Sequence, residues 1–520
     1  MGVLDKWVTN KLIKNKEVLY QIMDYRFNQG LIDQFNQSNP ENIFTRTLLE
    51  NNKWNSGIVE ELEWFYKNTY SKLIGYNTSP VISYFWHKVT PKTIRIHSGV
   101  PGLISKTMIN LIAGAGLNYS VMDENGNMDE EQTQRLQAIL DDNKFEERLL
   151  PEGVNAESYG GFFAFKISND PDVSEYPIIE VVPPENIEVI IKRGRIVGYK
   201  YKTNYKANKK DYERHEMYLS QDGGTLITYK LFEYVKAELR EVSFSGEDVE
   251  KYQDVFINVP LASVFKNNTP TNTQFKGAYY GVSDYNNSQS IFNALDEDLS
   301  QMLTAIRFNR PKRFLSEDLL TNVMNGKKME FNDFETDYEV VASDPDTESN
   351  KYQQFDNKMD ITVYIESFKQ LLVQALNNAG LSPASVGVTG LEALNASEGS
   401  QREKEKTTLR TREMKLSLWR PALRELFVKL LQFDDVANKG QQAGNYEVSI
   451  AFNDFSIPSL EQRIETANKA LNGGLVDIRK AVDMIFLDDL SEEEKIQMVL
   501  NIKTENGVPL TVEDAVATQE

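Results

Sequence analysis

The sequence contains no cysteine. This absence excludes disulfides, thiolate metal sites and a thiol nucleophile, and it agrees with a reducing compartment. Histidine is also scarce: only His87, His97 and His215 occur, without an HExxH motif or metal-ligand spacing. We therefore interpret the three histidines as structural or surface residues and predict no metal site.

Signatures of catalysis are missing as well. No glycine-rich loop leads into Lys and Ser/Thr as a phosphate-binding loop would, and "GLSPASVGVTG" lacks the Gly-x-Ser-x-Gly elbow. Asp296, Glu297 and Asp298 are adjacent acids of the kind that hold two metal ions. Leu295 and Leu299 belong to an apolar seam, however, so we expect these acids on a solvated or inter-subunit face. We predict no catalytic residue and no cofactor, with a metal-dependent nuclease or phosphoesterase as the alternative.

Long apolar runs are absent too. The most apolar segment, "MINLIAGAGLNYSVM" from Met108, is interrupted by Asn110 and Asn118 and is too short to span a bilayer. The N-terminus has no continuous apolar run typical of a signal peptide. The net charge is -20, from 57 Lys+Arg against 77 Asp+Glu. We expect no membrane partner, and the acidic balance disfavours a general affinity for nucleic acid.

What the chain does contain is an α+β pattern over 520 residues, enough for roughly three to four structural units. Residues 1 to about 75 are mostly helical in pattern, and Pro101 and Gly102 open a further buried helix. From about 157 to 265, short β-branched and aromatic runs predict an antiparallel sheet with one wet face. Tyr199 and Tyr201 there alternate with lysines.

Two long helices follow. The first is predicted from Ser283, as N-cap, to Phe308, roughly 39 Å long. The second runs from about Met359 to Asn378, with Gly380 beyond its end, and is roughly 30 Å long. Each has an apolar seam, and the segment between them is small and mixed, so the pair predicts a projecting hairpin. The seam residues are Tyr285, Ser288, Phe292, Leu295, Leu299, Met302 and Ile306 on the first helix, and Ile361, Ile365, Phe368, Leu372 and Ala375 on the second.

A third helix is predicted from about Gln401 to Gln432. Pro421 lies inside it, so a kink is expected near Trp419. "NYEVSIAFNDF" then predicts a strand, and the remainder is helical, with Ser459 and Ser491 opening capping boxes.

This colinear order resembles the portal proteins of tailed bacteriophages, in particular those of siphoviruses infecting Gram-positive bacteria. The resemblance covers roughly residues 70 to 506. It rests on "RIHSGVPGLISKTMINLIAGAGL", on the strands from "GGFFAFKIS" to "YKTNY", on "GVSDYNNSQSIFNALDEDLSQMLTAIRFNRP", and on "GLSPASVG" followed by "LSLWRPALRELFVKLL".

The fold that the resemblance implies is a portal-type ring subunit with a mixed wing domain, a long-helix stem hairpin, a small clip and a helical crown. The implied division is wing 1–280, stem helix 281–310, clip 311–357, second stem helix 358–380, tunnel loop region 381–401, kinked tunnel helix and wing strand 402–454, crown helices 455–506 and a flexible tail 507–520.

The function that the resemblance implies is structural. The protein would form a ring, expected to be dodecameric, at one vertex of the capsid, and would conduct double-stranded DNA during packaging and ejection. Its partners would be the terminase, the head-completion adaptor and the major capsid and scaffolding proteins, with assembly in the host cytoplasm and no membrane. We expect terminase to contact Lys312 to Asn350, at the tip of the hairpin. Another multimeric virion or tail component is the alternative.

The segment "NASEGSQREKEKTTLRTREMK", from Asn395 to Lys415, is the candidate site. It carries six basic and four acidic residues, a surplus too small for a DNA-binding helix. We predict that Asn395 to Gln401 form the constriction of the tunnel and that Arg402 to Lys415 hold it in register, with the interleaved charges pairing with neighbouring subunits. The alternative for these charges is a solvated helix face. The tunnel-loop residues are Asn395, Ala396, Ser397, Glu398, Gly399, Ser400 and Gln401; the inter-subunit residues are Arg402, Glu403, Lys404, Glu405, Lys406 and Arg410.

Overall fold

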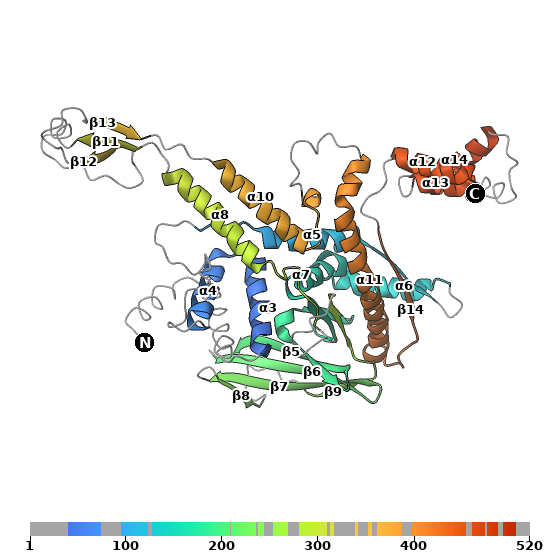
Figure 1. Cartoon of the computed structure of the whole chain (residues 1–520). Coiled ribbons are helices and arrows are strands. Elements are labelled where there is room, and N and C mark those ends of the chain that lie inside the picture. The colour runs from blue at the N-terminus through green and yellow to red at the C-terminus, as the bar shows by residue number, and fades with distance from the viewer. Residues whose placement is uncertain are drawn as a thin grey trace. The chain divides into compact units, whose positions relative to one another are not determined.

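The chain forms two compact units, residues Met1–Phe452 and Asn453–Glu520, in a computed structural model (Figure 1). The structure describes residues 40–73, 95–122, 127–207, 210–235, 238–243, 253–268, 280–308, 312–316, 338–341, 352–355, 361–386, 398–453, 460–473, 476–486 and 492–505. Each unit is considered by itself.

Helices form one side of the first unit. They are α3 (Pro40–Ser56), α4 (Val59–Leu73), α5 (Val100–Ala113), α6 (Glu130–Asp142) and α7 (Leu150–Gly160), the last preceded by a π-helical turn, Phe145–Leu149. Helix α5 begins after Gly99, whose φ is +73°, with proline in its first turn, and it ends at Gly114. The predicted glycine- and proline-bounded helix is thereby confirmed.

The β region divides into two sheets. Strands β2 (Phe162–Ser168), β3 (Ile178–Val182) and β10 (Ser263–Asn267) form a three-stranded antiparallel sheet in the order β10-β2-β3. Strands β4 (Ile187–Lys192), β5 (Arg195–Ala207), β6 (Lys210–Gln221), β7 (Gly224–Val235) and β8 (Glu238–Val242) form the larger antiparallel sheet, and β9 (Val255–Ile257) also pairs with β7.

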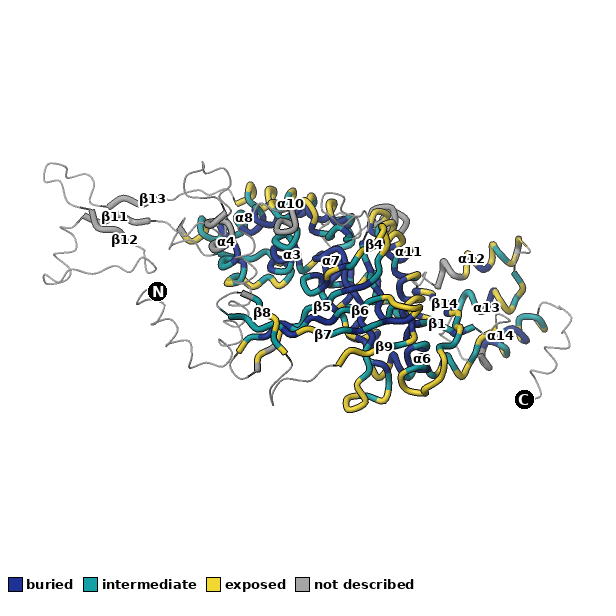
Figure 2. The backbone as a smooth tube through the Cα atoms, turned by 90° about the horizontal axis from the view of Figure 1, so that it is seen from below, coloured by how far each residue is buried: buried dark blue, intermediate teal, exposed yellow. Residues whose placement is uncertain are grey.

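The prediction of a single sheet is therefore wrong, although the strands themselves are confirmed. The first run belongs to a separate sheet because six of the seven residues of β2 are buried, which leaves it no wet face. In the larger sheet Tyr199 and Tyr201 are buried, whereas Lys200 and Lys202, which alternate with them, are partly exposed. Figure 2 shows how burial varies along these strands.

A small two-stranded sheet joins distant parts of the chain. Strand β1 (Leu117–Met122) pairs antiparallel with β14 (Glu447–Phe452), and Tyr119 faces Ile450. On β14 buried and exposed residues alternate, with Val448, Ile450 and Phe452 buried. The strand predicted near residue 450 is confirmed.

The two long helices are α8 (Gln289–Phe308) and α10 (Ile361–Asn378), which pack against each other. Helix α8 begins at Gln289, so the prediction of Ser283 as its N-cap is wrong. The Ser283 hydroxyl instead accepts a hydrogen bond from Tyr285 N at 2.9 Å and donates one to Ser158 O at 2.9 Å. These bonds hold residues 283–288 as a turn on α7, and the helix is about 30 Å long rather than 39 Å.

Burial along the two seams changes from one end to the other. Phe292 and Leu295 on α8, and Ala375 on α10, are fully buried. Towards the far ends, Ile306 is 42% exposed and Ile365 is 44% exposed. Between the helices, β11 (Lys312–Ser316) pairs parallel with β12 (Tyr338–Val341) and antiparallel with β13 (Tyr352–Phe355).

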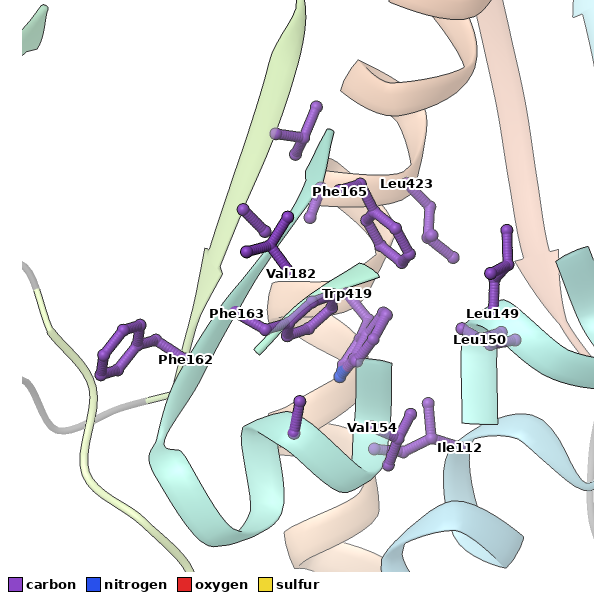
Figure 3. Packing of buried hydrophobic residues seen from close by; sticks show 14 of the residues in the cluster. Ile112, Leu149, Leu150, Val154, Phe162, Phe163, Phe165, Val182, Trp419 and Leu423 are labelled. Atoms are coloured by element: carbon purple, nitrogen blue, oxygen red, sulfur yellow. The ribbon is translucent and has the colours of Figure 1, made fainter. Parts of the chain in front are cut away.

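Helix α11 (Glu398–Ala437) packs against α5, α6, β2, β10 and β14. Its Trp419 is fully buried, with ring centroids 5.5 Å from Phe163 and 6.5 Å from Phe165, both on β2 (Figure 3). Pro421 lies inside the helix on an exposed position, and the chain continues as one helix past it. The helix is longer at both ends than the predicted range 401–432.

The described part of the second unit forms three helices, α12 (Leu460–Asn472), α13 (Ile478–Phe486) and α14 (Glu492–Glu505). Its buried apolar residues are Ala467, Ala481, Val482, Val499 and Leu500. Asp477 begins α13, because its carboxylate accepts a hydrogen bond from Lys480 N at 2.8 Å. Ser459 and Ser491, the predicted caps, lie outside the described residues, as does the predicted tail.

Within the described part of the chain, we find no helix with the length and apolar character needed to cross a membrane.

Candidate functional site: helix α11 and its anchors

The predicted constriction loop is partly helical. Glu398, Gly399, Ser400 and Gln401 form the first turn of α11, so the predicted boundary between loop and helix at residue 401 is wrong. The glutamates, lysines and arginines that follow are good helix formers, and an acid in the first turn complements the helix dipole, which extends the helix towards its N-terminus. Asn395, Ala396 and Ser397 lie outside the described residues.

The predicted inter-subunit residues divide by position. Arg402, Glu403, Lys404 and Glu405 are helical, and Lys406 and Arg410, one turn apart, are both exposed. The exposure of these last two agrees with a contact outside the chain. Their role stays a prediction.

The remaining basic residues of the segment face inward. Arg412 is 4% exposed, and its Nε donates to Leu111 O at 3.0 Å. Leu111 is in the last turn of α5, where helix carbonyls lack helical partners and the dipole favours a cation. Arg412 therefore caps α5 within the chain, and it is not among the residues predicted to pair with neighbouring subunits.

Lys415 is also buried, at 2% exposed, and it forms an ion pair with Asp284 at 3.0 Å. Asp284 lies in the turn before α8. Its carboxylate also accepts hydrogen bonds from Ser158 Oγ at 2.9 Å and from Asn268 Nδ2 at 3.1 Å. Lys415 thus fixes α11 to the turn that leads into α8.

A second buried ion pair, between Glu157 and Lys266, lies beside Trp419, one turn further along α11 than Lys415. Glu157 of α7 is fully buried and accepts hydrogen bonds from Lys266 Nζ at 2.5 Å and from Trp419 Nε1 at 2.7 Å. The Lys266 ammonium also lies 5.1 Å from the centroid of the Trp419 ring. We call Glu157, Lys266, Asp284 and Lys415 the charged cluster. It joins α7, β10, the turn before α8, and α11.

The four ionisable groups of the charged cluster perturb one another. Burial raises the pKa of Glu157, but the charges of Lys266 and Lys415 and two hydrogen bonds outweigh it, so the pKa is lowered. Burial lowers the pKa of Lys415, but Asp284 and Glu157 outweigh it and the pKa is raised. Burial raises the pKa of Asp284 and lowers that of Lys266. Glu157 and Lys415 are accordingly charged at neutral pH.

Backbone segments approach one another closely beside the cluster. Gly161 has a φ of +84°, and a Cβ there would lie 2.6 Å from Gly281 O. Asn268 N donates to Gly161 O at 2.7 Å. Only glycine fits such a crossing, which places the turn before α8 directly on the end of α7.

Nearer its N-terminus, α11 is bound to the end of α10. Thr408 Oγ1 accepts from Ser382 N at 2.8 Å and lies 2.7 Å from Ser385 Oγ. Thr411 Oγ1 donates to Gly380 O at 2.6 Å. Gly380, with a φ of +72°, ends α10 in a Schellman motif, because Leu381 N bonds to Leu376 O.

The C-terminal half of α11 is fixed as firmly. Lys429 Nζ donates to Ser263 O at 2.9 Å. Arg135 of α6 binds both oxygens of Asp434, at 2.8 and 2.7 Å, and Asp434 is fully buried. Anchors therefore extend along α11 from Thr408 to Asp434.

One of the three acids considered for a metal site, Asp296, lies elsewhere than expected, whereas Glu297 and Asp298 are partly exposed. Asp296 is fully buried, where a solvated or inter-subunit face was predicted. Its carboxylate lies 2.8 Å from His97 Nδ1 and accepts from Ser98 N at 2.7 Å, which holds the strand-like segment before α5 on α8. Among the described residues, no group of three or more His, Asp or Glu side chains is placed to hold a metal ion.

The sequence held a signal for the buried charges that we did not use. Thr408, Arg412, Lys415 and Trp419 follow one another at intervals of four, three and four, in phase with the buried Leu423. Polar residues on the apolar stripe of a helix are expected to be buried and to need partners. The partners themselves could not be found from that stripe.

One comparison with known proteins identifies a family. A family model described as "Phage portal protein, SPP1 Gp6-like" matches residues 49–507. A search of curated proteins gave no match. Among solved structures, a chain from the "Neck of empty GTA particle computed with C6 symmetry" has 11% identity and a TM-score of 0.39, with 80% of this chain and 91% of that chain covered.

A chain from the "Neck of native GTA particle computed with C12 symmetry" gives 11% identity and a TM-score of 0.38 over the same shares of the two chains. Because both TM-scores are low, neither likeness carries an argument about this chain. The family match stands by itself.

Proposed function

The chain belongs to the SPP1 Gp6-like family of phage portal proteins, and we propose that it forms a homo-oligomeric ring through which double-stranded DNA passes. The match from residue 49 to residue 507 is the observation that carries the function, because it spans the sheets, both long helices and α11 together. The protein is a structural portal of a tailed phage. We further propose that the ring is dodecameric and that it binds the partners named below.

Exposed apolar side chains support the ring. On α8 and α10 the chain exposes Ile306 at 42%, Ile361 at 40%, Val363 at 62% and Ile365 at 44%. These residues lie at the ends of the two helices furthest from the buried seam residues Phe292 and Ala375. Exposed apolar side chains of this kind favour contact with another protein surface, and copies of the same chain around a closed ring provide one.

The charge of the chain supports passage of DNA rather than adhesion. DNA carries two negative charges for about every 3.4 Å of its axis, and the chain has a net charge of -20. Electrostatic screening at physiological salt limits strong interactions to about 8 Å. Only side chains at the narrowest part of the ring would then act strongly on the duplex.

We assign the narrowest part to the N-terminal end of α11 and the residues before it, Asn395 to Gln401. Replacement of Gly399 and Ser400 by bulky residues should block packaging while the ring still assembles. Normal packaging by rings of that variant would contradict the assignment. Arg402, Glu403, Lys404, Glu405, Lys406 and Arg410 would pair with neighbouring subunits.

The proposed partners are those of a capsid vertex. Terminase would contact Lys312 to Asn350, which includes β11 and β12, and a head-completion adaptor would bind after packaging. Major capsid and scaffolding proteins would incorporate the ring during assembly in the host cytoplasm. Deletion of the segment should abolish terminase binding and spare the ring, whereas unaffected binding would refute the assignment.

The direct test of the proposal is the mass and image of the purified chain. Native mass spectrometry and negative-stain microscopy should show a closed ring with a central pore. A stable monomer at micromolar concentration, with no ring after capsid or scaffolding partners are added, would contradict it. Location of the protein away from the DNA-entry vertex of the virion would also contradict it.

A further inference from the structure

Helix α11 changes character at Thr408. Within the described side chains of this helix, Lys406 and Thr407 are exposed, and Thr408, at 3% exposed, is the first that is buried. Roughly three turns, from Glu398 to Thr407, precede it. From Thr408 onward, buried residues recur at helical spacing as far as Asp435.

Thr408 and Thr411, its neighbour on the next turn of the helix, both form hydrogen bonds to the segment that follows α10. Thr408 Oγ1 accepts from Ser382 N at 2.8 Å and meets Ser385 Oγ at 2.7 Å, and Thr411 Oγ1 donates to Gly380 O at 2.6 Å. All three partners lie within the seven residues that follow α10. The next anchors, Arg412 and Lys415, bind α5 and the turn before α8 instead.

The end of α10 is itself well fixed. Leu381 N bonds to Leu376 O at 2.9 Å in the cap, and Asn378 Nδ2 donates to Ser288 Oγ at 3.2 Å, just before α8. A displacement of α11 at Thr408 therefore acts on the C-terminal end of α10 before it reaches any other part of the body.

We propose that Thr408 and Thr411 form a clasp that is the pivot of α11. The turns before the clasp move relative to the body of the unit, the helix after it does not, and the movement is passed to the end of α10. Most of a helix's stability comes from tertiary packing of one face, so its end frays back to the first firm anchor. The clasp is this first firm anchor, whatever the N-terminal end of α11 contacts in the assembly.

Amide hydrogen exchange on the full chain tests the proposal, with the double variant Thr408→Val and Thr411→Val. Valine keeps the shape of threonine and has a similar helix propensity, so the change removes only the hydroxyls. Without the clasp the first anchors become Arg412 and Lys415. We expect the amides of residues 409–412, 381, 382 and 384–386 to exchange about tenfold faster, because a buried hydrogen-bonding group loses its partner.

Thr407→Val is the matched control, since Thr407 is exposed and adjacent, and it should leave both segments unchanged. Thr408→Ser with Thr411→Ser keeps the hydroxyls and should restore slow exchange. Faster exchange at Ser382 alone, with amides 409–412 unchanged, would overturn the pivot. Loss of protection throughout residues 422–433 would overturn it too, because the clasp would then support the whole helix.

Discussion

Replacement of Lys415 by methionine should strongly destabilise the first unit. Methionine fills much of the space of the lysine stem but leaves the Asp284 carboxylate, 3.0 Å from Lys415 Nζ, without its cation. The two side chains are 2% and 8% exposed. Removal of one partner from a buried ion pair costs about 3–5 kcal/mol. Leu409→Met, at an exposed position on the same helix, should change the free energy of unfolding by less than about 0.5 kcal/mol.

A second substitution separates the lost ion pair from lost packing. Asp284→Asn in the Lys415→Met background removes the unpaired charge, so the double variant should recover about 1–3 kcal/mol relative to Lys415→Met. The measurement is urea unfolding followed by tryptophan fluorescence, at one fixed protein concentration because assembly contributes to stability.

The pH dependence of the stability lost in Lys415→Met is the third test of the ion pair. Burial already raises the pKa of Asp284, although Lys415 opposes the shift, so loss of Lys415 should raise that pKa further. A carboxyl group whose pKa is higher in the folded than in the unfolded state loses stability as pH rises above its unfolded value. The deficit of Lys415→Met should therefore be smaller at pH 5 than at pH 8.

Three results would refute this account of the charged cluster. They are a loss below about 1 kcal/mol in Lys415→Met, a double variant that recovers nothing, and a deficit that does not change between the two pH values. The first would mean that water or another group takes over from Lys415. The others would mean that packing, rather than charge, fixes α11 to the turn before α8.

Other substitutions test separate features. Gly380→Ala should cost about 2–3 kcal/mol, measured as a shift of the urea midpoint, because φ is +72° and the new Cβ would lie 2.6 Å from Thr411 Oγ1. Val363→Glu should leave unfolding almost unchanged, since the side chain is 62% exposed, but should reduce ring formation in native mass spectra. Arg135→Met should cost about 2–3 kcal/mol at pH 7. Burial raises the pKa of Asp434, but hydrogen bonds from Arg135 and Asn438 lower it overall. The loss of stability in Arg135→Met should therefore shrink as the pH falls through the lowered pKa of Asp434. A loss of stability that does not change with pH would contradict this role of Arg135.

Much of the fold followed from local patterns. Apolar residues at intervals of three and four indicated α10 to within two residues, and proline and glycine bounded α5, because each of these signals acts through neighbouring turns of the same helix. The strands of the β region were likewise recognisable, but their division into two sheets was not. Which strands pair depends on residues far apart in the sequence. Strand β10 pairs with β2, although all the strands of the larger sheet lie between these two in the chain.

The start of α8 shows where local reasoning fails. Ser283 has the side chain of an N-cap, and it does bond to a backbone N–H two residues on, but its hydroxyl also donates to Ser158 of α7. Contact with α7 holds residues 283–288 as a turn that the helical period alone would have continued. The same kind of distant contact placed Asp296 in the interior, with His97 and Ser98.

By itself, the sequence determined the types of elements, their order, and the family to which that order belongs, because periodicity, capping residues and turn residues are local properties. Only the tertiary structure decided the use of the basic segment. Lys415 and Arg412 turn inward to Asp284 and to α5, and Trp419 meets Glu157 across 262 residues. A buried charge is stable only beside its partner, and that partner is brought to it by the packing of α7, β10, the turn before α8, and α11.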